Sequence, residues 1–220
     1  MDLPLAPFLA ALDLIAAVSF AATGALVASR KELDILGFVW FGVITGVGGG
    51  TLRDLLLGLP VFWVEDPTTV LVCIATAIAV HFAAHLIEYR YRYILWLDAF
   101  GMALVSVVGT LKALDAGAGV TVAIAMGVIT ANVGGIIRDT LGQEPSVILR
   151  REIYVAASML GAAACAALEV AGAGREAAAL AGFSAAFVLR MLALWRGWSM
   201  PAYKSRPGRE NPPTGFETDI

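Results

Sequence analysis

The stretch Gly42–Gly58, GVITGVGGGTLRDLLLG, combines two features that an apolar segment normally avoids. Five glycines lie between Gly42 and Gly50, and the charged pair Arg53-Asp54 follows directly. A glycine inside a helix costs about 1 kcal/mol relative to alanine, and a charge is expensive in lipid. Because the surrounding residues are apolar, the glycines and the charged pair need a structural or functional reason.

The composition around this stretch predicts an all-α integral membrane protein. Hydrophobic residues make up 59% of the 220 residues and charged residues only 15%, whereas a soluble domain carries about 25% charge. A membrane-spanning helix needs about 20 mostly apolar residues. The apolar runs of that length predict seven transmembrane helices, at Phe8–Ser29, Leu33–Leu57, Pro67–Glu88, Ile94–Leu114, Val120–Leu141, Ile153–Ala171 and Ala177–Trp198.

The basic residues predict how these spans are oriented. With seven spans, the side that holds the N-terminus carries three basic residues, Arg53, Lys112 and Arg175. The remaining twelve of the 15 lie on the other side. Since cytoplasmic loops are enriched in Lys and Arg, we expect a multi-pass protein of the cell inner (plasma) membrane, with the N-terminus outside and the C-terminus in the cytoplasm.

The opening stretch occurs twice in the chain. GVITANVGGIIRDTLGQEP begins at Gly127, 85 residues after Gly42, and overlays GVITGVGGGTLRDLLLGLP without a gap. Ten of these nineteen positions are identical. Each copy contains three spans, an odd number, so the copies must cross the membrane in opposite directions. The sequence therefore predicts two inverted three-helix repeats, 1–93 and 94–176, a seventh helix at 177–198 and a disordered cytoplasmic tail at 199–220.

The glycines predict kinks in the second and fifth helices. A broken helix frees backbone carbonyls, which are tolerated at membrane depth only where they line a wet cavity. Free carbonyls can replace the water around a cation. Side-chain oxygens for the same purpose come from Thr45, Thr130 and Asn132. The alternative is that the glycines allow close helix packing, as the spacing Gly42/Gly46/Gly50 would permit.

The charged residues of the two copies predict ion pairs at the two ends of this pathway. The pairs that the repeat suggests are Asp13–Arg53 and Asp98–Arg138. Each arginine can instead turn to the acid that follows it, Asp54 or Asp139, or extend to the membrane interface. Neutral variants of either arginine are expected to change transport without abolishing folding.

Other polar residues are interpreted as structural. Lys112, near the end of the fourth span, either extends to the interface or responds to voltage, and His81 and His85 are expected to pack at the interface rather than hold a metal. Cys73 and Cys165 fit small core residues. No nucleophile–base set, phosphate loop or metal spacing is present in the sequence, so we expect neither an enzyme, a cofactor nor a metal site.

Four segments resemble the prokaryotic members of the trimeric intracellular cation (TRIC) channel family: GVGGGTLRD, LPVFWV, NVGGIIRD and EPSVILRREIYVAAS. The resemblance covers all seven spans. It implies a homotrimer with one pore inside each protomer, flanked by the glycine-broken second and fifth helices and permeable to monovalent cations, potassium especially.

The residues that the resemblance assigns to the pore pathway are Gly48, Gly49, Gly50, Gly134 and Gly135, which join the oxygen-bearing residues Thr45, Thr130 and Asn132. The second copy departs from the first, because Asn132 and Val133 stand where Val47 and Gly48 stand. We therefore expect a less complete break in the fifth helix. The gating or ion-pair candidates are Asp13, Arg53, Asp54, Asp98, Arg138 and Asp139.

The function that these patterns favour is a potassium-permeable monovalent cation channel. The motif TVGYG is absent from the sequence, which excludes the filter of tetrameric potassium channels and predicts modest selectivity. The alternative is an inverted-repeat secondary transporter of a small ion or solute. A third possibility is a membrane scaffold without flux. The expected partners are the lipid bilayer, permeant K⁺ or Na⁺ and two further copies of the chain, but no nucleic acid.

Overall fold

The computed structural model describes residues 5–86, 90–146 and 152–201. The helices in these ranges are α1 (Leu5–Arg30), α2 (Ile35–Leu57), α3 (Phe62–Glu65), α4 (Thr68–Ala83), the 3-10 helix η1 (Ala84–Leu86), α5 (Arg90–Asp115), α6 (Val120–Leu141), α7 (Val155–Val170) and α8 (Arg175–Arg196). Among the described residues, pairing of β type is limited to an isolated bridge between Glu152 and Ser199. The all-α prediction is confirmed.

Six helices in the described part of the chain are long and apolar enough to cross a membrane, and the chain is a multi-pass membrane protein. The sixth predicted span is shorter than expected, since α7 has 16 residues. At 1.5 Å per residue it extends about 24 Å, less than the ~30 Å of a bilayer core. The short helix α3 was not predicted. The predicted tail lies outside the described residues from position 202 onward.

Local chemistry explains where α2 begins and ends. The carboxylate of Asp34 accepts a hydrogen bond from the backbone N–H of Gly37 at 2.8 Å and caps the first turn. Gly58 ends the helix with φ 67°, a left-handed conformation that glycine adopts without strain. Its N–H bonds back to the carbonyls of Asp54 and Leu55.

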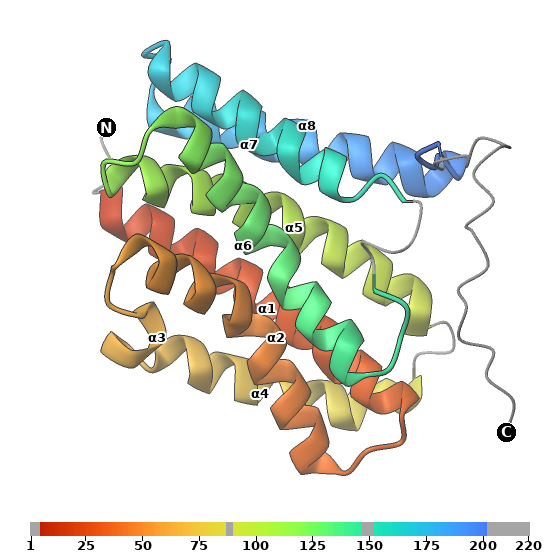
Figure 1. Cartoon of the computed structure of the whole chain (residues 1–220). Helices are drawn as coiled ribbons and strands as arrows, with labels where there is room; N and C mark the ends of the chain where they lie inside the picture. The colour runs from red at the N-terminus through yellow and green to blue at the C-terminus, as the bar shows by residue number, and fades with distance from the viewer. Residues whose placement is uncertain (1–4, 87–89, 147–151, 202–220) are drawn as a thin grey trace, which may run out of the picture.

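α1 and α5 form the interior of the bundle. Both are mostly buried, with α2 and α4 packed on α1, and α6, α7 and α8 packed on α5. α1 and α5 run in opposite directions, as do α2 and α6, which lie across them (Figure 1). We call the end at which α1 begins the first end of the bundle, and the opposite end the second end.

The glycines of α2 and α6 do not interrupt these helices. α2 is continuous helix from Ile35 to Leu57, and α6 from Val120 to Leu141. The unwound backbone that the sequence analysis expected at Gly48–Gly50 and at Gly134–Gly135 is therefore not seen in this conformation, because the helical carbonyls keep their partners. The kinks themselves stay a prediction, and the packing role described next accounts for the glycines.

Candidate functional site

The glycines bring the backbones of α2 and α6 into direct contact. A Cβ atom built on Gly49 would collide with the carbonyl oxygen of Thr130. A Cβ on Gly134 would lie 2.7 Å from the carbonyl oxygen of Thr45. The contacts are reciprocal, because Thr130 and Gly134 follow Thr45 and Gly49 by the same 85 residues. Reciprocal contacts of this kind are the property of two units related by a two-fold axis.

A second pair of glycines, one in each half of the chain, contacts the same two threonines. A Cβ on Gly24 of α1 would lie 2.7 Å from the Thr45 hydroxyl, and one on Gly109 of α5 would lie 2.8 Å from the Thr130 hydroxyl. Both threonines are thus held between a glycine of the central helix and a glycine of the crossing helix. Small residues at such interfaces let membrane helices approach closely.

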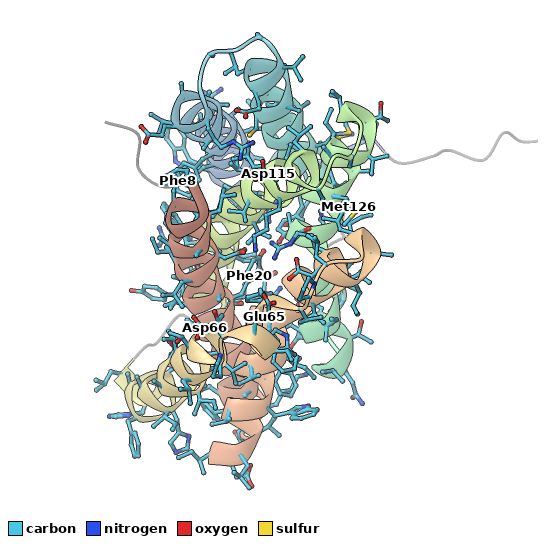
Figure 2. The ribbon with its side chains drawn as sticks, turned by 90° about the vertical axis from the view of Figure 1, so that its left-hand side faces the viewer. Phe8, Phe20, Glu65, Asp66, Asp115 and Met126 are labelled. Carbon is cyan, nitrogen blue, oxygen red and sulfur yellow. The ribbon has the colours of Figure 1, made fainter. Side chains whose placement is uncertain are left out.

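A small cavity lies at this crossing. Its volume is about 10 Å³, and its lining includes Asp13, Phe20, Phe62, Thr45, Gly46, Gly49, Gly50, Thr130 and Gly134. Figure 2 views the molecule from the first end, and Phe20 lies between the helices in the interior of the bundle. A volume of this size is close to the smallest that holds one water molecule, so the cavity is too small for a hydrated ion.

The two threonines present acceptor oxygens to this cavity. Thr45 Oγ1 donates its proton to the carbonyl of Phe41 at 2.6 Å, and Thr130 Oγ1 donates to the carbonyl of Met126 at 2.5 Å. With the hydroxyl protons engaged, the remaining lone pairs of each oxygen act only as acceptors. Acceptor oxygens can coordinate a cation, and the carboxylate of Asp13 at the same cavity is already paired with Arg53 and Lys112.

The first charged cluster closes the first end of this cavity. The fully buried Arg53 binds Asp13 through Nη1 at 3.1 Å and Asp54 through Nε at 2.7 Å. Lys112 of α5 binds the other oxygen of Asp13 at 2.6 Å. Two acids thus face two bases, and the named side chains sum to zero charge.

Phe62 of α3 lies over this cluster. Its ring centroid is 5.6 Å from the Arg53 guanidinium carbon and 5.5 Å from Lys112 Nζ. Its backbone N–H donates to Asp54 at 3.0 Å, and its ring is the contact that a Cβ on Gly50 would meet. Phe62 lines both the central cavity and a larger cavity of about 510 Å³ that opens at the first end.

That larger cavity carries acidic groups at its wall, contributed by Asp54, Glu65 and Asp115 beside Lys112. Glu65 and Asp115 are both visible from the first end in Figure 2. Next to it, the hydroxyl and backbone N–H of Thr68 bond to Asp66 and lower the pKa of that carboxyl below its ordinary value. Asp54 and Asp115 are ion-paired with Arg53 and Arg175, so the exposed Glu65 and Asp66 are the carboxylates best placed to attract cations at this end.

The second charged cluster repeats the first at the other end. Arg138 is buried and binds Asp98 at 2.5 Å and Asp139 at 2.9 Å. It also donates to the hydroxyl of Thr23 at 3.0 Å. A cavity of about 20 Å³ lies beside it, lined in part by Asp98, Arg138, Asp139 and Glu144. The expected partners are thus in contact at both ends; their role in gating stays a prediction.

A further arginine supports the second cluster from α8. The Arg190 side chain is buried, with its guanidinium carbon 5.0 Å from the ring centroid of Tyr154 and Nη2 2.5 Å from Glu152. Tyr154 is itself buried, and its hydroxyl and the side chains of Asp98 and Arg138 all lie within 4 Å of a Cβ placed on Gly135. The segment that precedes α7 thus contacts α8 beside the second cluster.

The structure separates the eight predicted pathway residues into two groups. Those that line the central cavity are Thr45, Gly49, Gly50, Thr130 and Gly134. The other three are not among its lining residues. Gly48 faces Ile137, Gly135 faces Arg138, and Asn132 donates from Nδ2 to Ser158 of α7 at 3.1 Å.

Phe62 and Tyr154 contact the charged clusters but were not predicted from the sequence. Lys112 was predicted to have a different role. Lys112 binds Asp13 rather than extending freely to the interface. His81 packs edge-on against Phe38 at 4.6 Å, and within the described ranges no cluster of His, Cys, Asp or Glu has the size of a metal site.

Sequence comparisons relate this chain to known bacterial membrane proteins. A family model described as "Glycine transporter" matches it twice, at residues 10–85 and 95–169. The UPF0126 inner membrane protein YadS of Escherichia coli K12 is 43% identical over 155 residues, which are 68% of this chain and 73% of that protein. A UPF0126 membrane protein of Vibrio cholerae is 33% identical over 197 residues, 87% of this chain and 81% of that one.

Structure comparisons point to the same kind of protein. A trimeric intracellular cation (TRIC) channel orthologue from Rhodobacter sphaeroides matches with a TM-score of 0.85 and 56% identity, over 87% of this chain and 99% of that chain. A prokaryotic TRIC channel matches with a TM-score of 0.83 and 26% identity, over 89% and 100%. These relatives are membrane proteins and channels rather than enzymes, which agrees with the sequence prediction.

Proposed function

This chain belongs to the TRIC family of membrane proteins, and from that premise we propose that it is a potassium-permeable monovalent cation channel with a pore inside each protomer. The observation that carries the proposal is the cavity between Thr45 and Thr130, where hydroxyl protons are engaged and only acceptor oxygens remain. A cation that loses water there gains oxygen contacts, whereas an anion gains none.

The proposed pathway joins three cavities along the crossing of α2 and α6. The wide cavity at the first end leads past Phe62 to the central cavity, and the second cluster lies between the central cavity and the small cavity at the second end. Conduction requires Phe62 and the two arginines to move, since the central cavity holds about one water molecule. The exposed acids Glu65 and Asp66 at the first end favour entry of cations over anions there.

The proposal includes the assembly and the orientation. The reciprocal contacts of Gly49 and Gly134, and the family model that matches both halves, support two inverted repeats. The name of the Rhodobacter relative supports a homotrimer. The excess of basic residues at the second end supports a cytoplasmic position for that end, in the inner membrane.

Ion flux through the purified protein in lipid vesicles tests this function. We expect unitary currents in a planar bilayer, with potassium and sodium passing and chloride largely excluded. The matched control is the Gly49→Leu variant, whose side chain occupies the crossing. Chloride flux equal to potassium flux, or flux that the variant leaves unchanged, would contradict the proposal.

A carrier is the second candidate, because the matching family model is described as a glycine transporter. Inverted repeats also occur in secondary transporters. Uptake of radiolabelled glycine into the same vesicles separates the two. Saturable glycine uptake that depends on an ion gradient, without unitary currents, would favour the carrier.

A further inference from the structure

An apolar groove lies between α5 and α8 at the second end, and it shares Leu95 with the small cavity beside Arg138. Its volume is about 530 Å³, and its lining consists of Arg92, Leu95, Trp96, Met191, Leu192, Leu194 and Trp195. Trp96 and Trp195 remain exposed, at 49% and 79% of their surface. Arg92 is the charged member of a lining that is otherwise hydrophobic.

Arg92, which lines the groove, and Arg196, which follows the lining residue Trp195, differ from the other basic residues. Wherever the structure describes a lysine or arginine side chain elsewhere, an ion pair joins it to a carboxylate; these residues are Arg30, Lys31, Arg53, Lys112, Arg138, Arg175 and Arg190. Within the described ranges Arg92 and Arg196 form no such pair. Arg196 lies instead over the rings of Trp195 and Trp198, at 5.8 and 5.5 Å.

Both arginines lie at the same end of the groove. Arg92 is in the first turn of α5, Arg196 is the last residue of α8, and the two helices pack together. Two cations without acidic partners at the second end of an apolar groove, one of them over Trp195 and Trp198, match an anion that carries a hydrocarbon chain. Tryptophan favours the headgroup level of a bilayer.

We propose that this groove binds an anionic phospholipid, with its headgroup phosphate between Arg92 and Arg196 and one acyl chain along Leu95, Met191 and Leu192. A soluble anion would gain nothing from the apolar wall, and a zwitterionic lipid would bring its own positive charge to the arginines. Each arginine near an anionic headgroup is expected to contribute about fivefold to affinity.

Quenching of tryptophan fluorescence by brominated lipids tests the site in the full-length protein. Brominated phosphatidylglycerol is expected to quench more strongly than brominated phosphatidylcholine at the same mole fraction, because Trp96 and Trp195 lie in the groove. Arg92→Gln and Arg196→Gln should each reduce the apparent affinity about fivefold, whereas Arg92→Lys should largely retain it. Lys31→Gln is the matched control, since it removes one charge at the same end from a residue that is paired with Glu144.

A second variant tests the apolar wall. Leu192→Trp fills the groove without changing charge and should lower retention of phosphatidylglycerol during purification, as native mass spectrometry measures it. Equal quenching by the two lipids, or an equal effect of Lys31→Gln and Arg92→Gln, would overturn the proposal. Dissociation of the oligomer in Arg92→Gln with lipid retention unchanged would also overturn it, because the groove would then contact another copy of the chain.

Discussion

Gly49 and Gly134 lie where the backbone of α2 meets the backbone of α6. Gly49→Ala adds a methyl group that collides with the carbonyl of Thr130, and Gly134→Ala adds one 2.7 Å from the carbonyl of Thr45. We expect each variant to lower the free energy of unfolding by about 1–3 kcal/mol, and to reduce ion flux. Thermal unfolding in detergent measures the first effect.

Gly119→Ala is the control for these two variants, because a Cβ there meets no atom within 4 Å. It should leave both stability and flux close to those of the unmodified chain. If Gly49→Ala and Gly134→Ala behave like Gly119→Ala, the glycines do not set the crossing, and the channel proposal loses its structural basis.

Arg138 is a buried cation in the proposed route of another cation. Arg138→Gln leaves Asp98 without its guanidinium partner, and we expect a loss of about 3–5 kcal/mol in the free energy of unfolding. In the protein that remains folded, potassium flux should rise, since a positive barrier has been removed and a carboxylate retained. Arg53→Gln should act in the same direction at the first end.

Arg138→Lys and Arg53→Lys serve as controls, because they keep the charge and lose only the planar geometry of the guanidinium. Flux through vesicles, normalised to folded protein, is the measurement. Unchanged flux in both glutamine variants would remove the arginines from the mechanism and leave them a purely structural role.

At the scale of the element, α3 is held over the first cluster by two polar contacts. The N–H of Phe62 bonds to Asp54, and Trp63 Nε1 donates to Thr51 at 2.8 Å. Phe62→Ala removes the ring that separates two cavities, so we expect potassium flux to rise several-fold with little change in selectivity. Val64→Ala is the matched control, because Val64 belongs to the same short helix and is 66% exposed. Equal flux in the two variants would argue against α3 as a barrier.

The elements themselves could be read from the sequence because apolar length and charge decide them. Six spans were found within a few residues, including α6 at Val120–Leu141. α7 was overestimated, since Ile153 and Tyr154 are apolar enough to extend a span but precede the helix. α3 was missed because four residues after Pro60 leave no periodic pattern.

At the scale of the whole molecule, Arg190 joins the last helix to the second cluster. Arg190→Gln breaks the bond to Glu152, and we expect a loss of about 1.5–3 kcal/mol in the free energy of unfolding. Because Tyr154 lies between Arg190 and Arg138, flux should also change. Arg190→Lys should restore most of the stability. A variant that unfolds more readily but conducts normally would limit Arg190 to holding α7 and α8 together.

The repeat explains which site residues the sequence could reveal. Thr45 and Thr130, or Arg53 and Arg138, are visible because both copies carry the same residue. Each missed residue occurs in one copy and has no identical counterpart at the matching position of the other copy. Lys112 aligns with a valine, Tyr154 with a threonine and Phe62 with a valine in the other half. A functional residue that occurs in only one half cannot be found by comparing the two halves of the sequence. It is recognised only from its contacts in the folded structure.

Asn132 shows the other limit of reading from sequence. It lies two positions after Thr130, so its side chain is turned by about 200° around the helix axis relative to that of Thr130. It therefore faces Ser158 rather than the cavity. Its place in the pathway stays a prediction, and in this structure Asn132 is not among the residues that line the central cavity.

The reciprocal contacts Gly49–Thr130 and Gly134–Thr45 suggest how the two halves of the chain arose. One three-helix module with a threonine four residues before a glycine already contains everything that this crossing needs. A half-length gene whose product inserted in either direction would have formed the same junction from two identical polypeptides. Duplication and fusion would then have freed each half to diverge, the first acquiring Phe62 and the second Lys112.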